Sequence, residues 1–367
     1  MPHTIRHLVA FVADQCPDAI SAALDSRFGI ERITLVGQPH QIDDIEPTLQ
    51  WLRQRLNLPV QVRALGSPAQ PAQYLAQATQ LLRDSGTGVG VNLNTEDAAS
   101  ACLMLMAAQA LNIPVFAVDT RSDRLIWLGA DAAVRPSLDI EDRLRCADVF
   151  EMQGYTLQAP HPILRRTQKF SCAPVLLSYA SRDESMLGRL VPKTGLQVHP
   201  GAAPPVVLQT LQQHGLLVRD ARGRLSLPDH DAAAFLRGGW LELVVVERLR
   251  QLAPTLGALD VRHAVQIRHR ESGQVIEFDV VCMMNNQLHI IECKSGDSRG
   301  AKFISHLEGI TRSHGLRARC MLISVDTLSD ALVAVAQGMH IACVHGRQLA
   351  RLDQALSAWL TQARPAG

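Results

Sequence analysis

The chain has 367 residues, enough for two or three domains at roughly 150 residues each. Hydrophobic residues make up 47% and charged residues 19%, so the composition excludes a disordered or fibrous chain. The 36 basic and 35 acidic residues nearly cancel. No whole-protein field therefore attracts nucleic acid or an anionic membrane, and any affinity for nucleic acid must be local.

The start of the chain and its cysteines indicate a cytoplasmic protein. The first apolar run holds Asp14 and lacks the basic region and small-residue cleavage site of a signal peptide. No apolar stretch approaches the ~20 residues that span a bilayer. The eight cysteines are scattered without a CxxC pair, which is typical of reduced thiols and disfavours a zinc site. We therefore expect no membrane contact.

Residues 1–150 predict a Rossmann-like α/β domain. Short apolar runs alternate with segments of helical periodicity. This alternation indicates βαβ units and a mostly parallel sheet. The predicted strands are 7–13, 33–37, 60–65, 89–94, 114–119 and 124–129, and the predicted helices are 43–56, 69–83 and 97–111.

Parallel sheets bind ligands beyond the carboxyl ends of their strands, so the loops at 13–17, 37–42 and 94–97 border any pocket. The candidate ligand contacts in these loops are Asp14, Gln15, Gln38, Asn94 and Thr95. The alternative for the third loop is plain helix capping, because Glu96 and Asp97 lie at the positive end of the next helix. Two carboxylates there would repel a phosphate. No GxGxxG motif is present, which argues against a dinucleotide enzyme.

Residues 151–235 predict a linker followed by a winged-helix-like segment. Prolines and glycines punctuate the first part. Residues 204–235 then indicate a helix that stops at His214-Gly215 and two strands around a turn at 220–223. A helix followed by such a hairpin resembles a winged-helix module, which either enters a DNA groove or serves as a linker or dimer contact.

Residues 236–367 carry the strongest chemical pattern, an apolar β-hairpin with charges at one end. Two apolar runs are joined by the turn Asn285-Asn286-Gln287. The period of a strand places Glu277 and Asp279 on one face, and likewise Glu292 and Lys294. Three carboxylates and an ammonium thus converge among apolar neighbours, where unpaired charges cost on the order of several kcal/mol.

This charge group favours a metal site for phosphodiester hydrolysis. Carboxylate oxygens suit Mg²⁺ or Mn²⁺, which keep waters and bind phosphate oxygens. Hydrolysis of a phosphodiester needs a water of lowered pKa and cations that offset the developing charge, and Lys294 would supply one cation. The alternative is a cross-strand salt bridge on a solvated edge. That alternative does not explain why the charges end the most apolar strands of the domain.

The pattern resembles the PD-(D/E)xK nuclease superfamily, in which an Asp on one strand is followed by (D/E)-x-K on the next. Asp279 and Glu292-Cys293-Lys294 match it. The resemblance implies that Asp279, Glu292 and the backbone carbonyl of Cys293 bind the metal and that Lys294 takes part in catalysis. Glu277 is expected to lie just behind the metal ligands.

Two further groups join this site by resemblance and by charge. Nucleases of this superfamily often carry an acidic residue on the preceding helix, which the resemblance places at Glu242; a surface Glu paired with a later Arg is the alternative. Across residues 262–319, nine basic residues face six acidic ones. Three of the six belong to the proposed site, so the rest forms a locally positive surface suited to a nucleic-acid backbone. Lys302 and Arg312 are the candidate contacts, and a merely solvated face is the alternative.

The order of parts resembles the type III CRISPR ancillary nucleases, which join an N-terminal CARF domain to a PD-(D/E)xK nuclease domain. The segment GGWLE at 238–242, the hairpin motifs and the strand PVFAVDT at 114–120 carry this resemblance. It implies a homodimer in which the CARF half binds a cyclic oligoadenylate and activates a metal-dependent endonuclease for single-stranded RNA or DNA. At 94–97, where such CARF domains typically have a Gly-rich turn with Thr and Lys, this chain has Asn-Thr-Glu-Asp.

Two other functions fit the same residues. One is a non-catalytic regulator in which a ligand-sensing domain controls a DNA-binding winged helix and the hairpin carboxylates are structural. The other is a repair or restriction-type nuclease without control by cyclic nucleotides.

Overall fold

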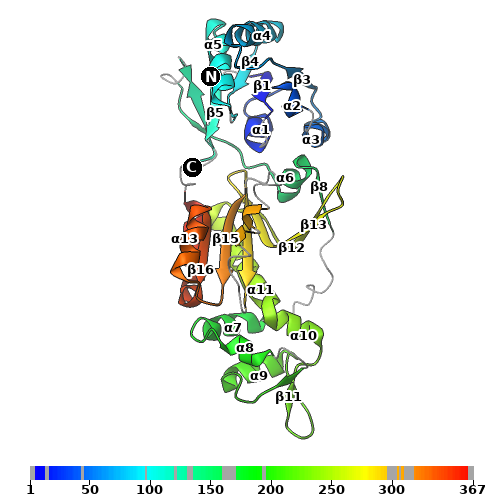
Figure 1. Cartoon of the computed structure of the whole chain (residues 1–367), viewed down its shortest axis with the longest axis vertical. Coiled ribbons are helices and arrows are strands. Elements are labelled where there is room, and N and C mark those ends of the chain that lie inside the picture. Colours follow the sequence, from blue (N-terminus) through cyan, green and yellow to red (C-terminus); the bar gives the residue numbers. More distant parts are fainter. Residues whose placement is uncertain are drawn as a thin grey trace.

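The computed structural model describes the residues in the ranges 5–12, 16–42, 45–95, 97–119, 122–129, 135–158, 171–191, 196–295, 304–305, 307–309 and 318–362. The molecule is elongated, with three parts stacked along its long axis (Figure 1). The N-terminal domain lies at one end and the middle segment at the other. The C-terminal domain lies between them, although it comes last in the sequence. Among the described residues, no helix is both long and apolar enough to cross a membrane.

The N-terminal domain is a seven-stranded sheet with helices on both faces. Its strands are β1 (His7–Phe11), β2 (Arg32–Gly37), β3 (Val60–Ala64), β4 (Val89–Asn92), β5 (Val115–Asp119), β6 (Arg124–Leu128) and β7 (Leu138–Asp139). Their order is β3-β2-β1-β4-β5-β6-β7. The pairs from β3 to β5 are parallel, while β6 and β7 are antiparallel additions. The predicted Rossmann-like fold is confirmed.

Five helices connect these strands: α1 (Cys16–Leu24), α2 (Pro39–Ile42), α3 (Glu46–Leu56), α4 (Pro71–Asp84) and α5 (Ala98–Ala110). Buried residues of α1 and α3 pack in one core cluster, and those of α4 and α5 pack in another on the opposite face of the sheet. The predicted strands and helices are all present, with bounds that differ by a few residues. Helices α1 and α2 and strand β7 were not predicted, because nine, four and two residues carry little periodicity; α2 lies in the predicted loop 37–42.

The C-terminal domain is a six-stranded mixed sheet. Its strands are β8 (Tyr155–Leu157), β12 (Leu259–His269), β13 (Val275–Met284), β14 (Gln287–Lys294), β15 (Arg319–Ser324) and β16 (Ile341–His345), in the order β16-β15-β14-β13-β12-β8. The pairs from β8 to β14 are antiparallel, and those from β14 to β16 are parallel. The sequence placed 155–157 in the middle segment; the structure corrects this, because these three residues pair with β12 at the sheet edge.

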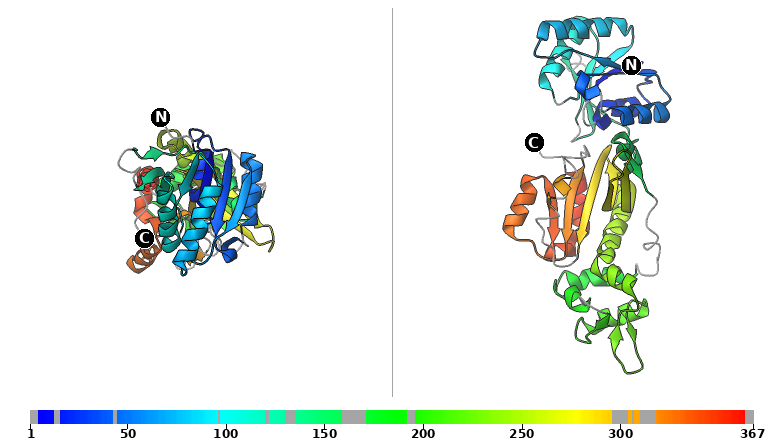
Figure 2. Two further views of the ribbon diagram at one scale, coloured as in Figure 1. Left: turned by 90° about the horizontal axis from the view of Figure 1, so that it is seen from above. Right: turned by 45° about the vertical axis from the view of Figure 1, so that its right-hand side comes forward.

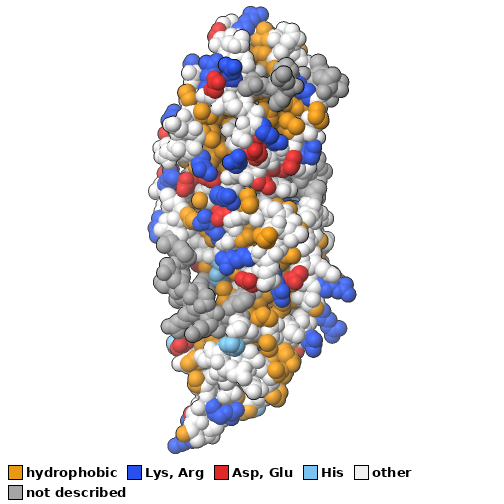
Figure 3. Space-filling model, turned by 180° about the vertical axis from the view of Figure 1, so that it is seen from behind, with side chains coloured by type: hydrophobic (Ala, Val, Ile, Leu, Met, Phe, Trp, Pro, Cys, Tyr) orange, Lys and Arg blue, Asp and Glu red, His pale blue; other side chains and the backbone are white. Residues whose placement is uncertain are grey.

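The helices that pack on this sheet include α6 (Cys146–Met152), α11 (Trp240–Leu256), α13 (Asp330–Gly338) and α14 (Leu352–Thr361), together with the 3₁₀ segment η5 (Gly346–Arg351). Buried residues of α11 and α14 share one core cluster, whereas α13 contributes to the cluster of the other face. Basic and acidic side chains are interspersed over the face of the molecule that Figure 3 shows.

The middle segment contains the expected helix and hairpin. It comprises α7 (Ala173–Ala180), α8 (Met186–Leu190), β9 (Gln197–Val198), α9 (Pro205–Gln213), β10 (Val218–Arg219), β11 (Leu225–Ser226), α10 (His230–Ala234) and the π-helical turn η4 (Phe235–Gly239). Strands β9, β10 and β11 form a small sheet that projects at the end of the molecule (Figure 2). Its buried residues continue into the core under α11, so this segment packs on the C-terminal domain through a shared apolar core.

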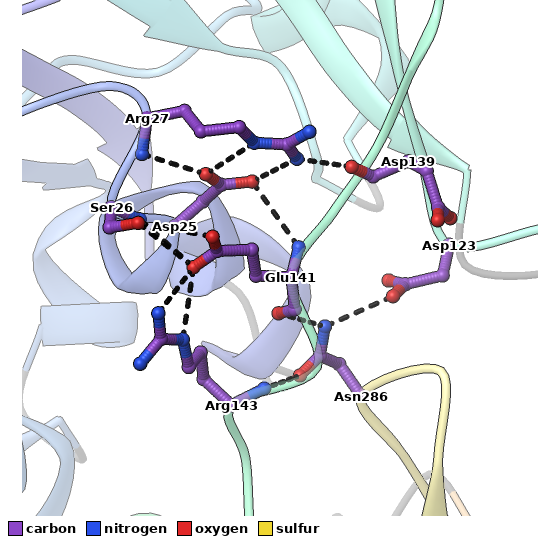
Figure 4. Close-up of polar contacts among 8 residues, drawn as sticks. All are labelled: Asp25, Ser26, Arg27, Asp123, Asp139, Glu141, Arg143 and Asn286. Atoms are coloured by element: carbon purple, nitrogen blue, oxygen red, sulfur yellow. Dashed lines mark hydrogen bonds and ion pairs between the residues drawn. The ribbon is translucent and has the colours of Figure 1, made fainter. Parts of the chain in front are cut away.

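A polar junction joins the N-terminal domain to the C-terminal hairpin, and we call it the Asn286 junction (Figure 4). Asn286, in the turn between β13 and β14, is 8% exposed and has a φ of 51°. Its side-chain amide donates to Asp123 (3.0 Å) and to the Glu141 carbonyl (3.1 Å). Its side-chain oxygen accepts from the backbone N–H groups of Arg143 (3.0 Å) and Leu144 (3.2 Å).

The other side of this junction is the C-terminal end of α1. The buried carboxylate of Asp25 accepts from the Arg27 guanidinium and from the backbone N–H of Glu141. The hydroxyl of Ser26 donates to the Glu141 carboxylate at 3.0 Å. The linker at 139–144 is therefore held from both sides, by α1 and by the hairpin turn (Figure 4).

Candidate active site and ligand-facing loops

The β13–β14 hairpin brings together Asp279, Glu292 and Lys294. Val280 pairs with Ile291 in the antiparallel ladder, which places Asp279 opposite Glu292. An Asp279 oxygen accepts from the backbone N–H of Cys293 at 2.7 Å and lies 3.7 Å from the Lys294 Nζ atom. The same ammonium contacts the Glu292 carboxylate. One ammonium thus bridges two carboxylates.

These charges lie in a largely apolar setting. The side chains of Asp279 and Glu292 are only 16% and 11% exposed. Burial raises the pKa of Asp279 to about 8, and the nearby carboxylates of Glu292 and Glu242 act in the same direction. Burial by itself would lower the pKa of Lys294, but the carboxylates of Asp279 and Glu292 outweigh it and raise that pKa. The group therefore carries an excess of negative charge that favours a proton or a cation.

The third carboxylate of this group comes from α11. Glu242 lies in the first turn of that helix, whose buried residues pack in one core cluster with Val280 and Ile291 of the hairpin. A Glu242 oxygen lies 3.1 Å from the Nε2 atom of His263 on β12, and the His263 side chain is 10% exposed. His263 was not among the predicted site residues. Its position opposite Val280 on the neighbouring strand is set by the β12–β13 register, which the sequence does not specify.

Glu277 is the expected member that the structure places elsewhere. It is exposed, and its carboxylate accepts from the side-chain amide of Gln266 at 3.1 Å. The expectation that Glu277, Asp279 and Glu292 converge is therefore corrected. The third carboxylate of the group is that of Glu242, while Glu277 bonds to Gln266 on β12. The strand period placed Glu277 on the face of Asp279, but it could not show that β12 supplies Glu277 with its own partner.

The thiol of Cys293 is unsuited to a nucleophilic role. The residue is 3% exposed, and burial raises the pKa of its thiol well above the ordinary value. Its backbone N–H holds Asp279. The other two expected contacts, Lys302 and Arg312, lie outside the described residues.

The donor set fits a divalent metal ion of the Mg²⁺ or Mn²⁺ type. Two adjacent carboxylates, a third nearby and the raised pKa of Asp279 form an electrostatic setting that a cation relieves. Among the described residues, no group of three or more His, Cys, Asp and Glu side chains is placed so that it could hold a metal ion. Mg²⁺ commonly binds through one or two carboxylates and completes its shell with waters and phosphate oxygens, so a set of three protein ligands is not required.

In the N-terminal domain, the loops after β2 and β4 meet at the carboxyl ends of the strands. Asp97 is the N-cap of α5: its carboxylate accepts from the backbone N–H groups of Ala99 and Ser100. The side-chain amide of Gln38 also donates to Asp97, at 3.4 Å. The charge of Asp97 is therefore directed at the helix N-terminus, as the capping alternative predicts.

Asn94 and Thr95, two of the candidate ligand contacts in this loop, bond to neighbouring protein groups. The side chain of Asn94 bonds to both the N–H (2.7 Å) and the carbonyl (2.8 Å) of Val118, and so ties the end of β4 to β5. The hydroxyl of Thr95 accepts from the Asp97 N–H at 3.2 Å. Asp14 and Gln15 lie outside the described residues. The sequence could not show whether Asn94 caps the helix or bonds to the neighbouring strand, because an Asn side chain is suited to both.

The fold and the site define a class of protein: a Rossmann-like, CARF-type domain joined to a nuclease-type α/β domain. Residues 229–363, which include most of the C-terminal domain, match the family model described as Card1-like, endonuclease domain. No match was found among curated proteins.

Solved structures share this fold over most of the chain. Protein VC1899 from Vibrio cholerae is 22% identical, with 96% of this chain and 97% of that chain aligned and a TM-score of 0.81. Can2 from Sulfobacillus thermosulfidooxidans, solved with cyclic tetra-adenylate, is 19% identical over 96% and 99% of the two chains, with a TM-score of 0.79. A type III CRISPR defence DNA nuclease activated by cyclic oligoadenylate is 19% identical over 87% and 45%, with a TM-score of 0.51. The resemblance to CARF-nuclease ancillary proteins is thereby confirmed at the level of the fold.

Proposed function

We propose that this protein is an endonuclease that hydrolyses phosphodiester bonds at the Asp279 site with Mg²⁺ or Mn²⁺, under control of a cyclic oligoadenylate bound by the N-terminal domain. The observation that carries the proposal is the pair of carboxylates Asp279 and Glu292, bridged by Lys294, in a domain that matches the Card1-like endonuclease family model. A structure of the same fold contains cyclic tetra-adenylate, which supports the proposed class of activator.

The charge of each residue at the site determines its proposed role in hydrolysis. Asp279, Glu292 and the carbonyl of Cys293 would hold the metal ion, which supplies a Lewis acid for the phosphate and lowers the pKa of a water. Lys294, held by both carboxylates, presents a fixed positive charge to the phosphate and stabilises negative charge that develops on it. Glu242, held by His263, would present a further oxygen from helix α11.

The test compares two amide substitutions on one strand. Wild type, Asp279→Asn and Glu277→Gln are incubated with single-stranded RNA, single-stranded DNA and supercoiled plasmid, with Mn²⁺ or EDTA, and with or without cyclic tetra- and hexa-adenylate. We expect metal-dependent, activator-dependent cleavage by wild type and Glu277→Gln. We expect a loss of about 100-fold or more in Asp279→Asn, the scale on which one stabilising group acts.

The other outcomes select the alternatives. Undiminished cleavage by Asp279→Asn would overturn the site. Metal-dependent cleavage that ignores both cyclic nucleotides would identify a repair or restriction-type nuclease. Absence of cleavage together with metal-independent binding to duplex DNA would identify the non-catalytic regulator.

We further propose a homodimer formed through α5. This helix is apolar on more than one face: Cys102 is exposed and Met106 is 54% exposed, while Met104 is fully buried. A helix that is apolar all round is typical of a buried position, which a second copy of the chain would provide. We expect twice the monomer mass in light scattering, and a monomer for Met106→Glu. A wild-type monomer at micromolar concentration would contradict the dimer.

A further inference from the structure

A basic groove of about 600 Å³ lies where α7, α11 and η5 meet. We call it the arginine groove. Three arginines line it: Arg182 follows α7, Arg248 lies on α11 and Arg347 lies on η5. Its other lining residues are Pro174, Leu177, Ser178, Ser181, Leu349 and Ala350. This described lining contains neither a carboxylate nor an aromatic ring.

The positive charge of the arginine groove is largely uncompensated. Arg182 and Arg347 are exposed, and among the described residues neither side chain has a hydrogen-bond or ion-pair partner. Arg248 lies 3.4 Å from the Asp353 carboxylate and donates to Gln251 at 3.3 Å. Three guanidinium groups share one carboxylate, so the groove carries an excess of positive charge in a chain with a net charge of only +1.

The groove lies at the same end of the C-terminal sheet as the candidate active site. Lys294 of β14 is in register with Ser324 of β15, which is in register with His345 of β16. Arg347 follows His345 by two residues. Neighbouring strands are about 4.8 Å apart, so the end of β16 is about 10 Å from the end of β14.

Helix α11 gives a second connection between the two sites. Glu242 lies in the first turn of α11, and Arg248 lies six residues further along. At about 1.5 Å per residue, the two positions are about 9 Å apart along the helix axis. A polymer held at the hairpin carboxylates therefore needs only a few further repeats to reach the groove.

We propose that the arginine groove binds the phosphodiester backbone of the nucleic acid that is cleaved at the hairpin, a few nucleotides from the scissile bond. This inference rests on the proposed function. Guanidinium groups match phosphate oxygens in charge and in fork geometry. The hydroxyl of Ser178 is exposed in the same lining and adds a neutral donor. Because the lining has no aromatic ring for base stacking, the contact is independent of base sequence.

The first measurement is binding without cleavage. Fluorescein-labelled 12-nucleotide single strands are titrated with full-length Asp279→Asn protein, and anisotropy is recorded over a series of salt concentrations. Arg182→Glu/Arg347→Glu is added to this background. The matched control is Arg53→Glu/Arg83→Glu, the same charge change at exposed positions of α3 and α4.

We expect the groove variant to bind the strand about 10- to 100-fold more weakly near 0.1 M salt. The slope of log affinity against log salt should become shallower by about 1.4, which is about 0.7 for each of two lost phosphate contacts. The control should change the affinity less than about 3-fold, since whole-protein charge acts weakly through screening salt. Equal affinity and slope in the groove variant and the control would overturn the proposal.

A second measurement separates this inference from the proposed function. Wild type and both double variants, without the Asp279 substitution, are assayed with Mn²⁺ and with cyclic tetra- or hexa-adenylate. The substrates are the 12-nucleotide strand and bis(p-nitrophenyl) phosphate, a diester too short to reach the groove. We expect kcat/KM of the groove variant to fall at least about 10-fold more on the strand than on the small diester. Equal losses on both substrates would contradict backbone docking. Failure of wild type to cleave either substrate would refute the proposed function, while the anisotropy series would still decide whether the groove binds a strand.

Discussion

Asp279→Asn should stabilise the metal-free C-terminal domain, and more so at high pH. In the folded chain, burial and the neighbouring carboxylates raise the pKa of Asp279 to about 8, against 3.8 for the free side chain. Between these values the folded state binds a proton that the unfolded state has released. The unfolding free energy of the wild type therefore falls as pH rises through this window. Asn does not titrate and retains an oxygen for the Cys293 N–H.

The size of this change in unfolding free energy follows from the width of the pH range between the two pKa values. From pH 5 to pH 8, three pH units at about 1.4 kcal/mol per unit give an upper bound of about 4 kcal/mol. The attraction of Lys294, which lies 3.7 Å away, acts on the ionised carboxylate and already lowers the pKa of Asp279, so the value of about 8 contains it. We therefore expect the advantage of Asp279→Asn over wild type to grow by 2 to about 4 kcal/mol across this range.

Hydrogen exchange of β13 and β14 peptides, measured by mass spectrometry in EDTA, reports the stability of this hairpin separately from the N-terminal domain. Wild type and variant are compared at the same pH, so that intrinsic exchange rates cancel. Glu277→Gln is the control, because Glu277 is exposed and pairs with Gln266. Parallel stability curves for wild type and Asp279→Asn would refute the argument that Asp279 is protonated in the metal-free fold.

Four other predictions test separate features. Added Mn²⁺ should raise the melting temperature of wild type and leave that of Asp279→Asn unchanged; equal shifts would contradict the metal site. Asn286→Ala should lower the urea unfolding free energy by about 2 to 4 kcal/mol, because buried groups lose partners, whereas Asn285→Ala should cost less. Burial lowers the pKa of His289 to about 3, so wild type should lose about 2 kcal/mol relative to His289→Gln between pH 7 and pH 5 as the unfolded state takes up the proton. Asp97→Ala should cost about 1 kcal/mol as a lost N-cap, and an unchanged midpoint would contradict that role.

The features that could be predicted from the sequence are those that depend on the order of apolar and polar residues within one segment. Alternating apolar runs predicted the parallel sheet, and the strand period with its turn predicted the hairpin that pairs Asp279 with Glu292. What could not be predicted depends on register between distant strands. His263 reaches Glu242 only because β12 pairs with β13 in one register, and the same pairing supplies Gln266 to Glu277.

Short elements and polar contacts between distant segments also could not be predicted from the pattern of residues within one segment. Strand β8 has three residues, and only its pairing with β12 shows that it belongs to the C-terminal sheet. The arginine groove combines single residues from three elements, and none of them stands out within its own segment. Asn286 could be predicted as a turn residue, but its contacts with residues more than 140 positions away could not.

The Asn286 junction connects the N-terminal domain mechanically to the hairpin of the C-terminal domain. Asn286 accepts from the linker backbone and donates to Asp123 of the N-terminal domain, so the linker cannot slide without stretching several bonds at once. The turn continues directly into β13 and β14, the two strands that carry Asp279 and Glu292. A displacement at the end of α1 therefore has one of two effects. It breaks the hydrogen bonds of the junction, or it tilts β13 and β14 and changes the distance between the carboxylates of Asp279 and Glu292.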